Sequence, residues 1–420
     1  MTLAVLDIND CNLQLWAGSQ HAQGAGYALF SKGDYQFGND ARARARLEPR
    51  STNTRYWWQL NTEPLQPALG PARHSADLVH AHLQALHSDA GRPEQVVLAV
   101  PGSLQRDQLA LLLGIVQACP FNATGLVNRS VAAASLLVTS ERAFHLELQL
   151  HQATITELSA DGDTITAPRT QPLPGCGMLQ LQERLVELIA AAFIRQTRFD
   201  PRRKADTEQA LYDMLPKVLA QLRSTGETIV EVSGNRASIS RSALTEAGSR
   251  LFTSAAEAIG ANAAHEQILL DPIVALLPGI DGHFANNRVL AEDSVNQAVQ
   301  QHRSVIEQST DELVLTGTLP CEGMTIRPNV EALADPVPPA RREGKVPTHL
   351  LVGQSAYALG GRNHPLAMEA TQETSGDWVL STDASGHTTL NDNPYAGENL
   401  VVGDTLVSEG TTALLIEVLS

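Results

Sequence analysis

The stretch Val96–Ala134, VVLAVPGSLQRDQLALLLGIVQACPFNATGLVNRSVAAA, decides the fold expected for this chain. It opens with a short apolar, β-branched run that ends at a Pro-Gly pair, which predicts a buried strand followed by a turn. Apolar residues then recur at helical spacing over Leu109–Val116, and Pro120 ends that helix. A second strand near Thr124–Val127 and a helix of small residues at Val131–Ala134 follow. This order predicts a crossover unit in an α/β sheet.

Length and composition favour a globular protein of two or three domains. The chain has 420 residues, of which 43% are hydrophobic and 18% charged. Its net charge of −16 argues against nucleic-acid binding and against binding to anionic membrane surfaces. We find no run of 18 apolar residues and no basic leader before the first strand, so the sequence predicts a cytoplasmic protein.

The four cysteines stand far apart and lack metal-binding spacing. We therefore expect free thiols, with metal ligation as the open alternative.

Several residues of the opening stretch resemble the nucleotide-binding domain of DnaK-type heat-shock chaperones. In that family a strand ends in valine-proline, a Gln-Arg pair opens the next helix, and Asn-Glu-Pro-Thr precedes three alanines. Here the matching residues are Val100-Pro101, Arg106 between Gln105 and Gln108, Asn128 and Ala132–Ala134. The Glu, Pro and Thr that lie near the nucleotide in the family are replaced by Arg129, Ser130 and Val131.

The resemblance implies the domain organisation. It implies an α/β, two-lobed fold of the actin/hexokinase/heat-shock kind over residues 1–330. A Pro-rich linker is expected at 331–346, followed by a small all-β sandwich at 347–420.

The first phosphate loop of that superfamily aligns with Ile8–Cys11, inside a hairpin expected from Leu3–Asp7 and Asn12–Trp16. Asp7 matches the aspartate that ends the first strand. Asn9 stands where the family has glycine, and Asp10 adds a carboxylate where phosphate would lie. If any nucleotide contact remains, the resemblance gives it to Asp7, Asn9, Asp10 and Glu147.

The second phosphate loop aligns with Phe144–Leu158, and every glycine of that loop is missing. Leu146, Leu148 and Leu150 alternate with polar residues, which predicts a plain β-hairpin in place of a phosphate clamp. Glu147 would direct a carboxylate at the place of the phosphate.

Further family features are missing downstream. No lysine occurs between Lys32 and Lys204, although the family carries one near the nucleotide. Pro272 and Ile273 replace the two glycines that make room for adenosine. Helices are expected at Met178–Arg198, Ala205–Arg223, Ser240–Ile259 and Ala291–Ile306.

The C-terminal segment is similar to forkhead-associated domains in its last strands, where Leu400, Gly403 and Asp404 match the family pattern. Strands are expected at His349–Val352, Ala356–Leu359, Trp378–Leu380, Thr388–Leu390, Asn399–Val402 and Leu414–Leu419. If this segment binds phosphopeptides, the resemblance implies that Arg362 and His387 contact the phosphopeptide.

Three functions remain open at this point. The leading hypothesis is a non-catalytic scaffold or adaptor, a pseudo-ATPase that binds protein partners and needs no cofactor. The alternative is a divergent ATP-dependent chaperone in which Asp7, Asp10 and Glu147 hold magnesium. The third is a phosphopeptide-binding adaptor that acts through its C-terminal domain. The sequence does not predict an oligomeric state or the identity of a partner.

Overall fold

The computed structural model describes residues 3–308, 313–321, 344–360, 370–372, 376–380, 388–391, 393–395, 399–408 and 411–418. The chain divides into two compact units, Met1–Ile326 and Arg327–Ser420, which are treated separately. Most of the linker expected at 331–346 lies outside the described residues. Among the described helices, none has both the length and the apolar character needed to cross a bilayer.

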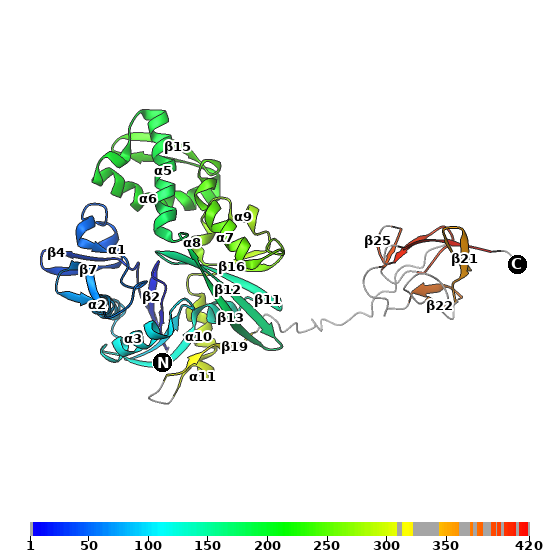
Figure 1. Ribbon diagram of the computed structural model, residues 1–420, viewed down its shortest axis with the longest axis horizontal. Helices are drawn as coiled ribbons and strands as arrows, with labels where there is room; N and C mark the ends of the chain where they lie inside the picture. The colour runs from blue at the N-terminus through cyan, green and yellow to red at the C-terminus, as the bar shows by residue number, and fades with distance from the viewer. Residues whose placement is uncertain are drawn as a thin grey trace. The chain divides into compact units, whose positions relative to one another are not determined.

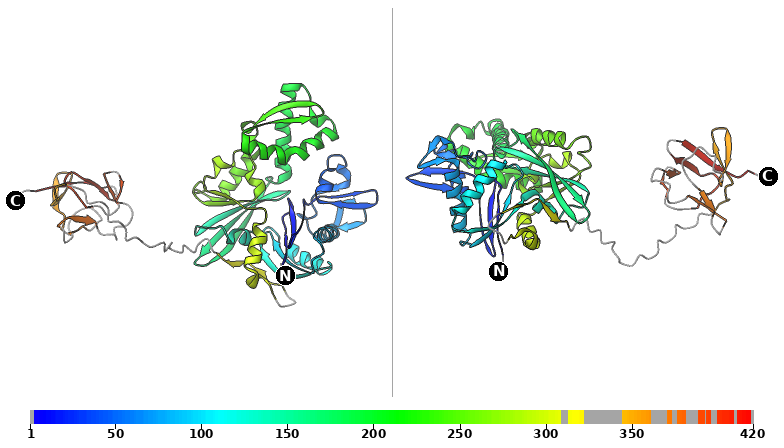
Figure 2. Two further views of the ribbon diagram at one scale, coloured as in Figure 1. Left: turned by 180° about the vertical axis from the view of Figure 1, so that it is seen from behind. Right: turned by 60° about the horizontal axis from the view of Figure 1, so that its bottom comes forward.

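The first unit contains two six-stranded sheets (Figures 1 and 2). The first sheet has the order β18-β10-β9-β1-β2-β3. Its strands are β1 (Ala4–Asp7), β2 (Leu13–Ala17), β3 (Gln20–Gly24), β9 (Gln95–Val100), β10 (Asn122–Asn128) and β18 (Leu315–Thr316). Strands β1 to β3 are antiparallel, whereas β9 and β10 run parallel to β1. The first hairpin and the strand–helix–strand unit expected from the sequence are confirmed.

The second sheet repeats this pattern in the order β17-β16-β11-β12-β13-β19. Its strands are β11 (Arg142–Leu148), β12 (Gln152–Asp161), β13 (Thr164–Pro174), β16 (Gln267–Leu270), β17 (Asn287–Val289) and β19 (Thr318–Pro320). Again three consecutive antiparallel strands are followed by two strands that run parallel to the first of them. The β-hairpin predicted over Phe144–Leu158 is confirmed as β11 and β12.

The remaining elements of this unit cover the sheets and form two outer parts (Figure 1). Its helices are α1 (Gly38–Arg42), α2 (Ser75–Asp89), α3 (Arg106–Gln117), α4 (Arg129–Ser135), α5 (Met178–Thr197), α6 (Ala205–Thr225), α7 (Ser249–Ile259), α8 (Pro272–Ala275), α9 (Ile280–His283), α10 (Ser294–Gln301) and α11 (Arg303–Ile306). Short strands form β4 (Ala28–Ser31), β5 (Asp34–Phe37), β6 (Thr52–Asn53), β7 (Pro64–Leu69), β8 (Ala72–His74), β14 (Glu227–Val232) and β15 (Asn235–Ser240).

Two helices differ from the sequence-based expectation. The helix expected over Ser240–Ile259 begins at Ser249, because Ser240 is paired with Glu227 in a hairpin and residues 242–248 form a 3-10 helix. The helix expected over Ala291–Ile306 begins at Ser294 and is divided into α10 and α11 by His302, whose φ of −95° and ψ of 22° lie outside the helical region.

One hydrophobic core lies between the two sheets and contains helix α4. It unites Val97 and Val127 of the first sheet with Leu158 and Leu269 of the second. Every residue of α4 is buried. Three alanines in this helix allow close packing on both sides. The first residue of α4, Arg129, is therefore buried as well.

The described elements of the second unit are all strands. They are β20 (His349–Val352), β21 (Ser355–Ala358), β22 (Ala370–Gln372), β23 (Trp378–Leu380), β24 (Thr388–Leu390), β25 (Asn393–Pro394), β26 (Thr405–Ser408) and β27 (Thr411–Ile416). The strand expected at Asn399–Val402 is wrong. That segment is a loop in which the Asp404 carboxylate accepts the Val401 N–H at 2.8 Å, and the strand begins at Thr405. Arg362 and His387 lie outside the described residues.

Candidate functional site

Arg129 lies at the centre of a buried group of acidic side chains. Asn128 caps helix α4 by accepting the Val131 N–H at 3.1 Å, which fixes Arg129 at the first helical position. The Arg129 side chain then reaches three carboxylates that come from β1, β11 and the residue before α8. We call Arg129, Asp7, Glu147 and Asp271 the Arg129 cluster.

The guanidinium binds all three carboxylates at short range. Its Nε donates to Asp7 Oδ1 at 2.6 Å, and its Nη1 donates to Glu147 Oε2 at 3.1 Å. Nη1 and Nη2 both lie 3.3 Å from Asp271 Oδ1. All four side chains are buried. A fork with five N–H donors suits this arrangement, which a lysine could not reproduce.

The Arg129 cluster joins the two sheets. In the first sheet, Asp7 ends strand β1 and Arg129 follows β10. In the second sheet, Glu147 belongs to β11 and Asp271 follows β16. His145 extends the group, because its Nε2 lies 3.2 Å from Asp271 Oδ1 and its Nδ1 lies 3.0 Å from Ser130 Oγ.

Three carboxylates around one guanidinium leave an excess of buried negative charge. Burial raises the pKa of Asp7, and the nearby Asp271 and Glu147 add to that shift against the opposing effect of Arg129. Burial also acts to raise the pKa of Asp271, but Arg129 and His145 outweigh it and hold the pKa below its ordinary value. The carboxylates together keep the pKa of Arg129 well above its usual range, so Arg129 is charged.

The first loop, between β1 and β2, is held by its own side chains. Asn9 accepts the Cys11 N–H at 2.9 Å and donates to Asp271 Oδ2 at 3.3 Å. Asp10 Oδ1 accepts the Leu150 N–H at 2.7 Å. Burial raises the pKa of Asp10 to about 7, so its carboxyl is only partly ionised at neutral pH. Asp10 therefore carries less than the full negative charge that the sequence predicts for it.

The turn between β11 and β12 packs directly against the start of α5. The first two N–H groups of the helix, from Met178 and Leu179, donate to the carbonyls of Gln149 and Leu150 at 2.9 and 3.0 Å. Free N–H groups at a helix start commonly bind anions. Here the protein's own carbonyls occupy these donors.

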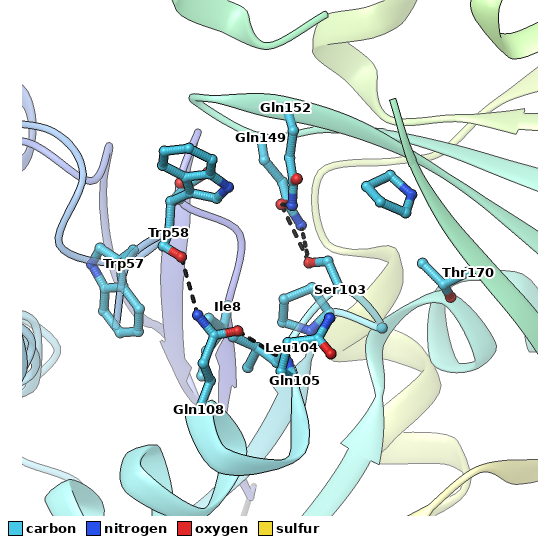
Figure 3. A pocket seen from close by; sticks show the side chains of 14 residues that line it. Ile8, Trp57, Trp58, Ser103, Leu104, Gln105, Gln108, Gln149, Gln152 and Thr170 are labelled. Carbon is cyan, nitrogen blue, oxygen red and sulfur yellow. Dashed lines mark hydrogen bonds between the residues drawn. The ribbon is translucent and has the colours of Figure 1, made fainter. Parts of the chain in front are cut away.

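A cavity of about 260 Å³ lies beside Asp10, between the two sheets (Figure 3). Trp57, Trp58 and the segment that leads into α3 line one side. The other side is lined by Gln149 of the turn between β11 and β12, and by Gln152 and Thr170 of the second sheet. Gln149 connects this cavity to the Arg129 cluster, because its Nε2 donates to Ser103 Oγ and to Glu147 Oε1, each at 2.8 Å.

The structure brings together the residues that the sequence singled out in the first unit. Asp7 and Glu147 share Arg129, Asn9 reaches the same cluster through Asp271, and Asp10 lies beside it. Sequence reasoning noted Arg129 only as a departure from the family pattern, and it missed Asp271 and His145. The signal for Asp271 was its position after an apolar strand, as for Asp7.

No family model matches the chain, and no curated protein is significantly similar to it in sequence.

The raised pKa of Asp10 makes a specific prediction about stability and pH. The folded protein holds this proton up to about pH 7, whereas the unfolded chain releases it near 3.8. The contribution of Asp10 to stability is therefore largest at low pH and is lost as the pH rises through 7. We expect Asp10→Asn to be about 2 kcal/mol more stable than the wild type at pH 8, with a smaller gain at pH 5.

Urea unfolding of both proteins at the two pH values measures this difference. An asparagine can still accept the Leu150 N–H, so the comparison isolates the charge. A stability difference that does not change with pH would contradict the prediction.

Proposed function

We propose that this chain is a non-catalytic scaffold or adaptor, built on a two-lobed frame of the actin/hexokinase/heat-shock kind. The frame is supported by the two sheets of the first unit, in which five strands follow the same order; the sixth strand, β18 or β19, lies at opposite ends of the two sheets. It is also supported by the strand–helix–strand–helix order over β9, α3, β10 and α4, which is the part of the chain that carries the resemblance.

The observation that carries this proposal is the position of the Arg129 guanidinium. The resemblance aligns Asp7 with the first phosphate loop and Glu147 with the second, and the guanidinium binds both carboxylates. A metal-bound nucleotide would have to compete with Arg129 for these groups. Because phosphoryl transfer depends on positioned cations and phosphate-binding amides, a site arranged in this way favours a pseudo-ATPase.

The occupied helix start supports the same conclusion. The amides of Met178 and Leu179 are bound by the protein's own carbonyls, so they are not free for a phosphate. No lysine or arginine lines the cavity beside Asp10 in the described part of the chain. A polyphosphate would therefore meet no cationic side chain there.

Calorimetry of the whole chain with ATP and Mg²⁺ tests the proposal. We expect no binding heat at millimolar ATP, and micromolar affinity would contradict the proposal. The alternative, a divergent ATP-dependent chaperone in which Asp7, Asp10 and Glu147 hold magnesium, predicts steady-state phosphate release as well.

A scaffold also needs protein partners, and the second unit is the part that we propose for this role. Phosphopeptide binding through Arg362 and His387 stays a prediction, because both residues lie outside the described part of the chain. Loss of a phosphopeptide pull-down in Arg362→Ala would support it.

A further inference from the structure

We propose that the cavity beside Asp10 binds a small organic amine in its cationic form. The cavity is formed by both sheets of the first unit, and its volume of about 260 Å³ suits a short alkyl diamine. This inference depends on the cavity alone and goes beyond the proposed scaffold role.

The charge of the lining selects a cation. Asp10 is the one ionisable side chain among the 14 residues that line the cavity. No lysine, arginine or histidine is part of this set, so an anionic ligand would find no counter-charge. The net charge of −16 on the whole chain also attracts cations towards the protein.

The polar side chains offer oxygen atoms that can accept hydrogen bonds from an ammonium group. Only one oxygen of the Asp10 carboxylate accepts a hydrogen bond from another residue within the described chain, namely from Leu150 N. Ser103, Gln152 and Thr170 add hydroxyl and amide oxygens around the same space (Figure 3). An ammonium group carries up to three N–H donors, which fits a lining rich in acceptors.

Trp58 supplies an aromatic surface at the edge of the cavity. Its side chain is 40% exposed and lies at the cavity wall, facing the glutamines in Figure 3. The Trp58 indole also stacks on the imidazole of His151, with the two ring centroids 5.1 Å apart. Burial lowers the pKa of His151, so this imidazole is neutral and does not repel a cation. Indole rings attract cations through their electron-rich faces.

A peptide strand is a poorer occupant, although the cavity borders the part of β13 that lies beyond its pairing with β19. The Gln152 carbonyl accepts the Gln149 N–H and so points towards β11. The backbone of its partner on β13, Pro174, therefore directs its hydrogen-bonding positions away from β12, towards the outer side of the sheet. The same holds for Pro172, two residues earlier. Neither proline has an N–H to donate, which prevents a regular ladder with an added strand.

Isothermal calorimetry at pH 8 with putrescine tests the proposal on the whole chain. The matched neutral probe is 1,4-butanediol, which replaces both amines with hydroxyl groups. We expect submillimolar binding of putrescine and binding of the diol that is at least about tenfold weaker. Equal affinities for the two probes, or no putrescine binding at 10 mM (roughly the weak end of useful affinities), would overturn the proposal.

Three variants locate the binding site. We expect Asp10→Asn and Trp58→Ala each to weaken putrescine binding by about tenfold, and Trp58→Phe to weaken it less. Trp16→Phe is the control, because Trp16 stacks on His21 and does not line the cavity. Unchanged affinity in Asp10→Asn would overturn the proposal, since that variant retains the fold-stabilising contact to Leu150.

The pH dependence gives an independent readout. Besides burial, the groups that act on the pKa of Asp10 are the Leu150 N–H, Glu147 and the backbone N–H of Asp10 itself. Asp10 in turn raises the pKa of Cys11 and of Tyr56. We expect putrescine affinity to rise by up to about tenfold from pH 6 to pH 8 in the wild type and to stay constant in Asp10→Asn. A constant wild-type affinity would overturn the proposal. Failure here would leave the ATP titration, and with it the proposed function, unaffected.

Discussion

Replacing Arg129 by methionine is expected to lower the free energy of unfolding by about 3 to 5 kcal/mol. Methionine has a similar length and fills part of the same volume, so the loss would come mainly from charge. Without the guanidinium, Asp7, Glu147 and Asp271 would remain buried with no cationic arginine between them. Each would have to take up a proton or admit water, and both processes oppose folding.

Two further variants separate this effect from the general cost of losing an arginine. Arg184 lies 2.6 Å from Glu246 on an exposed surface, and Arg184→Met should cost no more than about 1 kcal/mol. The triple variant Arg129→Met, Asp7→Asn, Asp271→Asn removes most of the unpaired charge and should recover part of the stability. Urea unfolding measures the stability of Arg129→Met, of Arg184→Met and of the triple variant. If Arg129→Met and Arg184→Met unfold at the same midpoint, the cluster is not the structural centre that we describe.

The sequence predicts most elements of the first unit because their signals are local. The alternation of apolar residues in β11 is complete within that one strand. The helical spacing of apolar residues in α3 is likewise complete within that one helix. The Pro-Gly pair after β9 marks a chain reversal that depends on no distant contact.

The elements that the sequence missed depend on distant partners. Ser240 belongs to a strand because it pairs with Glu227, although the residues after it have an apolar pattern typical of a helix. The segment Asn399–Val402 contains residues that favour strands. It is held as a loop, because the Asp404 carboxylate accepts the Val401 N–H and the Asp404 carbonyl accepts the Leu415 N–H. Local propensity cannot reveal such contacts.

The Arg129 cluster shows the same limit for charged residues. Arg129 is separated from Asp7 by 122 positions and from Asp271 by 142. The resemblance marked Arg129 as a departure from the family pattern, but pairing between charges is a property of the folded sheets. The partly protonated state of Asp10 could not be predicted either, because it results mainly from burial.

Gly177→Ala is the second variant for which we expect a large effect, a loss of about 3 kcal/mol or more. The backbone of Gly177 has φ −73° and ψ 166°, which alanine adopts without strain. The difficulty is space, because an added Cβ would lie 2.4 Å from His151 C and 2.5 Å from Gln152 N. These are backbone atoms of the turn between β11 and β12, so they cannot move aside as a flexible side chain would.

This variant also tests whether the turn is closed onto the helix start, as the pseudo-ATPase proposal requires. If the turn between β11 and β12 could move away from α5 to admit an anion, alanine at 177 would be tolerated. The matched control is Gly114→Ala within α3, where an added Cβ has no neighbour within 4 Å and should stabilise the protein by up to about 1 kcal/mol. Thermal or urea unfolding of the two variants distinguishes the cases. Equal stability of Gly177→Ala and the wild type would mean that the helix start is open to a ligand.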